Sequence, residues 1–293
     1  MPKVRGPLFS ISARKSLGKV LTFQGRPGGA AVYPYKEPKV PLTDKQIWQR
    51  EKIAYLVSWW QSLSLADKAV WEAKAKGQGQ SGYSYFIRQQ KNWMLDPSVV
   101  LWLPLWSETL KGDSFVSKDS YGHTCNVTGA TWTSQGRLFS GNDTIIIPNH
   151  AAFNFGASTD FTLIARASTS LSSPQYLIFK GDLGPGLTNY TLRLSITPFT
   201  ADAWLDDGTT LVSRAGTTNL VDGVLHLYTA TFDRDGNLTL IVDGEVEGAP
   251  VSISGVGDID NAEDLIISGR LSGGVKDYEW RGLISEVLIY NRL

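Results

Sequence analysis

Residues 225–242 read LHLYTATFDRDGNLTLIV, and this stretch has the pattern of a β-hairpin. Residues 225–232 and 238–242 are short runs rich in β-branched, aromatic and aliphatic side chains, which favour extended strands. Asp233-Arg234-Asp235-Gly236 lies between them and has the composition of a tight turn. The stretch therefore predicts two antiparallel strands.

The same pattern of short strands and turns is predicted from residue 97 to residue 293. Short β-rich runs alternate with turns rich in Gly, Asn and Asp, and no helical pattern separates them. The other strands predicted in this way are residues 144–147, 161–165, 176–179, 192–196, 201–205, 265–268 and 283–290. A succession of this kind predicts a mainly β domain built as an antiparallel sandwich.

The preceding part of the chain has a different composition. Residues 1–42 are rich in Gly, Pro and basic side chains, and they predict an extended arm with one or two β-hairpins. Residues 43–96 are expected to form a small unit of three helices. The first helix starts at the capping box Thr43-x-x-Gln46, the second runs from Ser64-x-x-Asp67 to about Lys76, and the third covers residues 83–91. The expected domains are thus 1–42, 43–96 and 97–293.

Charge divides the chain in the same place, although Lys+Arg and Asp+Glu both number 28. Residues 1–96 hold sixteen basic and six acidic side chains, a net charge of +10, and residues 97–293 have a net charge of −10. Cys125 is the one cysteine, which excludes a disulfide framework and a cysteine zinc cluster within one chain. The apolar runs are too short to span a membrane, and Arg14 and Lys15 interrupt the stretch that a secretory signal would need.

A series of short motifs occurs in order along residues 97–293. They are VLWLPL at 100–105, VSKDSYG at 116–122, VTGATW at 127–132, FSGND at 139–143, DFTL at 160–163, DGVLH at 222–226, VDG at 242–244 and GLISEVLIYNR at 282–292. Together they resemble the laminin-G-like, concanavalin A-like lectin domain. The resemblance implies a jelly-roll sandwich in a family of glycan binders, adhesion modules and purely structural modules.

The resemblance also implies candidate sites. Many members bind calcium, and Asp119 is the best candidate ligand, although Ser285 stands where the family often has an aspartate. Asp182 and the cluster Asp258, Asp260, Asn261 and Asp264 offer further oxygens, with ordinary turn residues as the alternative interpretation. For sugar stacking the candidates are Trp204, Trp280 and Tyr278, each of which is equally compatible with core or edge packing.

Residues 1–93 are similar to a recurrent N-terminal module of tailed-bacteriophage and prophage proteins. The similar stretches are residues 6–23, 38–46, Arg50, 60–71 and 81–86. The resemblance implies a virion structural accessory protein, a head decoration or head fibre, made in the host cytoplasm and anchored to capsid proteins through residues 1–93. A tail- or neck-associated host-attachment protein is the alternative. The basic side chains expected to face an acidic particle surface are Arg5, Arg14, Lys15, Lys19, Arg26, Lys36 and Lys39.

In this setting the lectin-like domain would adhere to glycans on host or environmental surfaces. An oligomer is compatible with the sequence, but no coiled-coil heptad imposes one. DNA binding is a further alternative, since residues 59–75 resemble part of the high-mobility-group box, with the helices in the wrong order. Glycan hydrolysis is another, but it needs two flanking carboxylates, and no strand carries the Glu-x-Asp-x-x-Glu alternation. We therefore expect no enzyme and no nucleic-acid partner.

Overall fold

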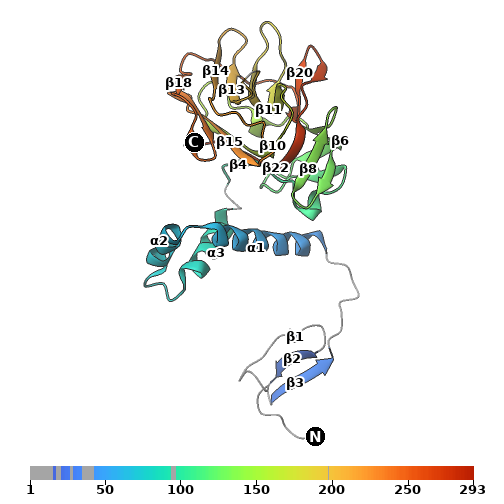
Figure 1. Cartoon of the computed structure of the whole chain (residues 1–293), viewed down its shortest axis with the longest axis vertical. Helices are drawn as coiled ribbons and strands as arrows, with labels where there is room; N and C mark the ends of the chain where they lie inside the picture. Colours follow the sequence, from blue (N-terminus) through green and yellow to red (C-terminus); the bar gives the residue numbers. More distant parts are fainter. Residues whose placement is uncertain (1–15, 18–20, 27–28, 35–42, 94–96, 197) are drawn as a thin grey trace. The chain divides into compact units, whose positions relative to one another are not determined.

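The computed structural model describes residues 16–17, 21–26, 29–34, 43–93, 97–196 and 198–293 (Figure 1). The chain divides into two compact units, Met1–Gln46 and Ile47–Leu293. In the first unit, β1 (Ser16–Leu17), β2 (Leu21–Arg26) and β3 (Gly29–Pro34) form a three-stranded antiparallel sheet. The hairpin predicted within residues 1–42 is therefore present in the described part of the arm.

Three helices follow, as the sequence predicts: α1 (Asp44–Ser62), α2 (Leu65–Ala75) and α3 (Gly82–Trp93). The capping box is formed, because the Thr43 amide donates to Gln46 Oε1 at 3.1 Å and the Gln46 amide to Thr43 Oγ1 at 3.4 Å. Phe86 is fully buried between Trp60 and Trp71, with ring centroids 5.3 and 5.2 Å away. No helix within the described residues has the length and apolar character needed to cross a bilayer.

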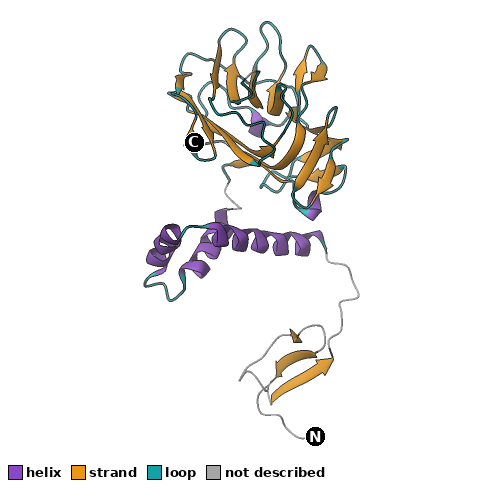
Figure 2. Cartoon of the chain, viewed as in Figure 1, coloured by secondary structure: helices purple, strands orange, loops and turns teal. Residues whose placement is uncertain are grey.

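The rest of the second unit is mainly β, and its strands are arranged in two antiparallel sheets (Figure 2). The first sheet has the order β17-β16-β15-β10-β22-β8-β7, with β18 paired to β16 and β4 to β22. Its strands are β4 (Val99–Pro104), β7 (Thr131–Thr133), β8 (Gly136–Ser140), β10 (Phe161–Ser168), β15 (His226–Phe232), β16 (Asn237–Val242), β17 (Glu245–Val246), β18 (Val251–Ser252) and β22 (Arg281–Tyr290).

The second sheet has the order β14-β13-β12-β11-β19-β9-β6-β5. Its strands are β5 (Ser114–Val116), β6 (Thr124–Thr128), β9 (Thr144–Ile147), β11 (Gln175–Gly181), β12 (Asn189–Leu194), β13 (Ala201–Asp206), β14 (Leu211–Ala215) and β19 (Leu265–Ile267). A separate hairpin joins β20 (Arg270–Ser272) to β21 (Val275–Asp277), and the short 3₁₀ helices are η1 (Glu108–Leu110) and η2 (Ala151–Phe153). This architecture confirms the jelly-roll-like antiparallel sandwich.

The hairpin from which the fold was inferred is present. β15 and β16 pair antiparallel, with Tyr228 opposite Val242 and Phe232 opposite Leu238. The Gly236 amide donates to the Asp233 carbonyl at 3.0 Å and closes the turn. Consecutive strand residues point to opposite faces, so the inward set of the hairpin joins the core between the two sheets.

The first sheet has apolar side chains on both faces. Leu163 and Ala165 of β10 point into the core between the sheets, whereas Ile164 points the other way. On that outer face a second apolar cluster forms around Leu56 of α1 and Trp102 of β4. Helix α1 thus covers part of the outer face, and most of the helical region belongs to the same unit as the sandwich.

Candidate functional site

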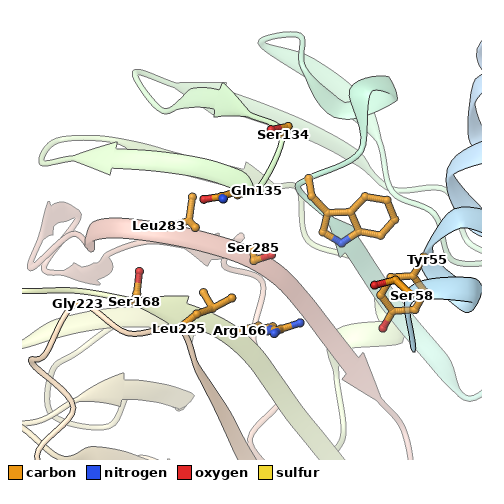
Figure 3. Close-up of a pocket in the computed structure, with 11 residues that line it drawn as sticks. Tyr55, Ser58, Ser134, Gln135, Arg166, Ser168, Gly223, Leu225, Leu283 and Ser285 are labelled. Carbon is orange, nitrogen blue, oxygen red and sulfur yellow. The ribbon is translucent and has the colours of Figure 1, made fainter. Parts of the chain in front are cut away.

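A groove of about 730 Å³ lies on the outer face of the first sheet, beside α1 (Figure 3). Its lining comes from α1, the loop before η1, strands β10 and β22, the β7–β8 turn and the loop before β15. The lining residues are Tyr55, Ser58, Trp106, Ser134, Gln135, Arg166, Ser168, Gly223, Leu225, Leu283 and Ser285. We call this hollow the groove.

Helix α1 forms one wall of the groove, and the contacts that hold it are specific. Tyr55 stacks on Trp106 with ring centroids 5.4 Å apart and planes 8° from parallel. Glu51 accepts a hydrogen bond from Ser107 Oγ at 2.5 Å and another from the Glu108 amide at 2.7 Å. Because these bonds fix α1 at the loop that carries Trp106, the aromatic pair is held as a preformed surface.

The floor of the groove is made by β10 and β22. Arg166 pairs with Glu286 across the two strands, but Ala167 pairs with Ile284, so Ser285 is the extra residue of a β-bulge. Such bulges change the direction in which a strand presents its side chains. Here the bulge places Ser285 in the groove lining together with Arg166.

The turn between β7 and β8 supplies Ser134 and Gln135 to one rim. Gly136 directly follows this turn with φ +147°, and a Cβ atom there would lie 2.4 Å from the Ile284 carbonyl oxygen. A glycine is required because the backbones of β8 and β22 approach so closely. The backbone approach therefore fixes how the turn presents its two polar side chains.

The opposite rim contains Gly223 and Leu225, and His226 tethers it to the β16–β17 turn. His226 Nδ1 lies 2.6 Å from Asp243 Oδ2, and its Nε2 lies 3.1 Å from Asp222 Oδ1. Partial burial alone would lower the pKa of His226, but the hydrogen bonds to the two carboxylates outweigh it and leave the pKa raised. The pKa of Asp222 is lowered, chiefly by the hydrogen bond from the Val224 amide. The pKa of Asp243 is also lowered: burial raises it, but hydrogen bonds from His226 and the Leu227 amide outweigh that effect.

Arg166 is the charged side chain in the groove lining, and it is exposed. Glu286, its cross-strand neighbour, is buried beneath the aromatic wall and accepts a hydrogen bond from Trp102 Nε1 at 2.8 Å. Burial raises the pKa of Glu286, against the lowering effects of that bond and of Arg166. The groove is therefore polar and cationic at its floor and aromatic at its wall.

The groove continues into a second hollow of about 450 Å³. Ser134, Gln135, Ser168, Gly223 and Leu283 line both. The extension adds Thr133, Leu138, Thr169, Ser170 and Gly282. The combined surface is lined largely by hydroxyl and amide groups.

The lining has the chemistry of a binding site. Flat aromatic rings and leucine side chains can contact the CH faces of a sugar, while hydroxyl, amide and guanidinium groups can bond its oxygens. Of the described residues that line the two hollows, none is a carboxylate. Hydrolysis of a glycosidic bond by the usual mechanism needs a pair of carboxyl groups, and the described lining of these hollows does not supply them.

Two of the sequence-predicted sugar-stacking residues lie elsewhere: Trp204 on β13 of the second sheet, and Tyr278 directly after the β20–β21 hairpin, where its carbonyl accepts from the Tyr176 amide of β11. Trp204 is 7% exposed, packs with Tyr176 and Phe179, and lies under the Arg193 guanidinium at 4.1 Å. Tyr278 is 44% exposed, but the Arg270 guanidinium covers its ring at 4.5 Å. Both rings already have cationic partners from the chain itself.

Trp280, the third predicted stacking residue, is fully buried in the main core. Its indole nitrogen donates to the Ser168 carbonyl at 3.2 Å, so it supports the end of β10 from behind the groove. A ring without exposed area offers no face for stacking on a sugar. Its place in the structure is that of a core residue.

Asp119, the predicted calcium ligand, is bonded to the backbone instead. Its Oδ2 accepts from the Trp102 amide at 3.0 Å, and its Oδ1 accepts from the Tyr121 and Gly122 amides at 2.9 and 3.0 Å. Its side chain is fully buried. Over the ranges that the structure describes, no group of three or more His, Cys, Asp or Glu is placed to hold a metal ion. Both carboxylate oxygens of Asp119 therefore already have backbone donors as partners.

The acidic loop at residues 258–264 already has a cation of its own. Lys180 is fully buried, and its Nζ donates to the Asn261 carbonyl and Oδ1 at 3.1 and 2.7 Å and to the Glu263 carbonyl at 2.7 Å. Burial lowers the pKa of Lys180 to about 8, opposed by the nearby acidic side chains. An internal ammonium group thus organises these oxygens.

Of the predicted anchoring residues, Arg26 lies at the end of β2. The others lie outside the described residues: Arg5, Arg14, Lys15, Lys19, Lys36 and Lys39.

Apart from Ser285, which stands where the resembled family often has an aspartate, the groove residues were not among those that the sequence singled out. Tyr55 belongs to a helical aromatic stripe and Trp106 to an apolar run, and nothing in the sequence indicates that they stack. Arg166 carried one usable signal: it is the charged residue of β10 and stands at an outward-facing position. No local sequence pattern predicted the β-bulge at Ser285.

Comparison with known proteins gives a family and a fold. No curated protein matches the sequence. The binding domain of Paraclostridial Mosquitocidal Protein 1 is 16% identical, with a TM-score of 0.51 over 67% of this chain and 49% of that one. The receptor binding domain of botulinum neurotoxin C/D mosaic serotype is 14% identical, with a TM-score of 0.50 over 67% and 48%. The present chain thus spans about half the length of each.

A sialidase from Trypanosoma rangeli also aligns, at 20% identity and a TM-score of 0.49, over 67% of this chain and 30% of that one. These likenesses are of fold. The family model described as Concanavalin A-like lectin/glucanases superfamily matches residues 139–293, and the strands β4 to β8 that precede or enter this range complete the same two sheets. The chain belongs to the concanavalin A-like lectin/glucanases superfamily.

Proposed function

We propose that this protein is a lectin-type glycan-binding accessory protein and that the groove is its binding site. The observation that carries the proposal is the preformed Tyr55–Trp106 stack beside an open floor of polar side chains. Preformed, concave surfaces with an aromatic face and a few polar groups are typical of small-ligand sites. The lectin-like fold supports this, since the groove lies on one of its two sheets.

Trp106→Ala in the full chain tests the proposal. The wild type and the variant are applied to an immobilised glycan panel, and bound glycans are then titrated by calorimetry. We expect Trp106→Ala to weaken binding about tenfold or more, taking as a guide the roughly 1–3 kcal/mol that an aromatic side chain contributes when a nucleic-acid base stacks on it. Circular dichroism checks that the variant is folded.

Tyr278→Ala is the matched control, because it removes an exposed aromatic ring outside the groove, directly after the β20–β21 hairpin. We expect it to bind glycans like the wild type. If Tyr278→Ala abolishes binding while Trp106→Ala retains it, the site lies on the second sheet and the groove assignment is wrong. Release of reducing ends from a bound glycan would instead support the hydrolase alternative.

We also propose a virion as the setting, with residues 1–93 as the anchor on capsid or tail proteins. The support is the resemblance of residues 1–93 to phage modules and the net charge of +10 on residues 1–96. The antiparallel sheet of β1, β2 and β3 lies in a unit separate from the lectin-like sandwich, so this part of residues 1–93 can hold the particle while α1 belongs to the unit that carries the groove. Many copies on one particle would turn weak glycan contacts into avid adhesion.

Quantitative mass spectrometry of purified particles tests this setting. Hundreds of copies per particle would favour the head-decoration role, and a few copies in multiples of three or six would favour a neck or tail position. Absence from particles would remove the virion proposal and leave the glycan proposal standing. Salt-dependent DNA binding by the full chain would then become the alternative role for the basic N-terminal region.

A further inference from the structure

We propose that the groove selects anionic saccharides, with Arg166 pairing with a carboxylate or sulfate group of the sugar. This inference rests on the proposed function, because it specifies the ligand of the same site. It follows from three observations: the hydrogen-bond partners of Arg166, those of the other donors in the groove, and those of the nearby carboxylates.

Arg166 is the first observation. Within the part of the chain that the structure describes, its guanidinium makes no hydrogen bond or ion pair. Other arginines of the sandwich are paired: Arg193 bonds Asp202 at 2.6 Å, and Arg270 bonds Asp277 at 2.6 Å. A guanidinium presents a planar fork of donors that matches a carboxylate or sulfate, so Arg166 is positioned to take one from a ligand.

The donors around Arg166 are the second observation. Ser285 is 7% exposed and lines the groove, yet its hydroxyl has no hydrogen-bond partner among the described residues. The indole N–H of Trp106 and the side-chain amide of Gln135 are likewise without a partner in the described chain. Buried or half-buried donors without partners, here Ser285 and Trp106, favour a ligand rich in acceptors, and the exposed amide of Gln135 adds a donor at the rim.

The carboxylates near the groove are the third observation. Glu286 is the neighbouring acid, but it is buried and accepts the Trp102 indole hydrogen, and it does not line the groove. Asp222 is held by His226 on the far side of the rim. An anionic sugar in the groove would therefore meet the Arg166 guanidinium and several hydrogen-bond donors. Glu286, the neighbouring acid, is bonded to the Trp102 indole and does not line the groove.

The aromatic wall supplies the rest of the specificity. An anionic sugar has a CH face as well as its charged group. The stacked pair Tyr55–Trp106 can take that face while Arg166 takes the charge, because both line one continuous hollow. Neutral sugars could use the wall but would leave the guanidinium unpaired.

The experiment compares acidic and neutral members of matched pairs. The full chain is titrated with polygalacturonate and its methyl ester, with sialyllactose and lactose, and with dextran sulfate and dextran. We expect at least one acidic member to bind about tenfold or more tightly than its neutral partner, because a hydrogen-bonded charge pair contributes on the order of 1.5–3 kcal/mol. Which pair responds separates a carboxylate from a sulfate ligand.

Arg166→Gln identifies the residue that reads the charge. We expect it to lower affinity for the acidic member about ten- to a hundredfold and affinity for the neutral member far less, because Gln keeps a hydrogen-bond donor at this position. Lys276→Gln, which removes an exposed cation from β21 outside the groove, is the matched control and should bind like the wild type. Circular dichroism and melting temperature verify the fold of both variants.

The outcomes separate the two proposals. Equal binding of acidic and neutral members, with Arg166→Gln unchanged, overturns the anionic-ligand inference and leaves the glycan-binding function in place. An equal loss for Lys276→Gln shows that binding follows net charge alone, which also overturns it. Binding to no member of any pair contradicts the glycan-binding function itself.

Discussion

Replacing Asp119 by Asn should destabilise the sandwich, and the loss should not depend on calcium. The Asp119 carboxylate accepts three backbone hydrogen bonds: from the Trp102 amide on β4, and from the Tyr121 and Gly122 amides in the next turn. The two ends of this link are 17 residues apart, so the carboxylate holds a turn onto a strand of the first sheet. Asn keeps one accepting oxygen and turns the other atom into a donor.

The magnitude follows from which bonds remain. Each bond to a charged acceptor contributes about 1.5–3 kcal/mol net. If the Asn oxygen stays with the Tyr121 and Gly122 amides, its NH₂ group faces the Trp102 amide, donor against donor. That loses one charge-assisted bond and weakens two others, whose donors Tyr121 and Gly122 are exposed residues that can bond water instead. We therefore expect a loss of about 2–4 kcal/mol in the free energy of unfolding.

Urea unfolding followed by tryptophan fluorescence measures this loss, with calcium and with a chelator. Asp258→Asn is the matched control, because this exposed carboxylate accepts one bond, from the Asp260 amide at 2.9 Å. Its loss should stay below about 1 kcal/mol. If Asp119→Asn were as stable as the wild type, or were destabilised in calcium buffer alone, the structural role assigned to Asp119 would be refuted.

Three further predictions concern the buried cation, the rim and the groove backbone. Lys180→Met should lower the free energy of unfolding at neutral pH by about 1–3 kcal/mol because the Asn261 oxygens lose their donor. The folded-state pKa of Lys180 is lowered to about 8, so above that pH the unfolded chain binds more protons than the folded chain. The stability of the wild type relative to Lys180→Met should therefore rise between about pH 8 and 10.4, as measured by urea unfolding. His226→Gln should cost more stability at about pH 6 than at about pH 9. The folded-state pKa of His226 is raised, so its protonated form stabilises the folded protein below the ordinary histidine pKa, and this contribution is lost as the pH rises through the raised folded-state pKa. Equal costs at the two pH values would contradict the hydrogen bonds assigned to His226. Gly136→Ala should cost about 1–3 kcal/mol in thermal unfolding and weaken glycan binding, because the added Cβ meets the Ile284 carbonyl; an unchanged melting temperature would contradict this packing.

The sequence was informative about strands and helices because their signals are local. The run at 144–147 became β9 with the same bounds, and the hairpin at 225–242 formed with its expected turn. The capping box at Thr43 is present as well. Hydrophobic alternation and turn chemistry act within a few residues, so they can be recognised without knowing the tertiary fold.

The site was harder to predict because it depends on contacts across long separations. Trp280 and Trp204 stand in polar surroundings in the sequence, yet the fold buries the first in the core and covers the second with Arg193. The groove wall joins Tyr55 to Trp106, and its floor depends on a one-residue bulge in β22. No local pattern encodes which aromatic ring meets which strand, so the groove became visible only in the folded chain.

The position of a bound glycan tests the central claim most directly. A glycan that binds the full chain in the panel can be soaked into crystals and its electron density located. We predict density in the groove, with a sugar ring against the Tyr55–Trp106 stack and polar contacts to the floor of β10 and β22. Density on the outer face of the second sheet near Trp204 and Tyr278, with an empty groove, would contradict the account.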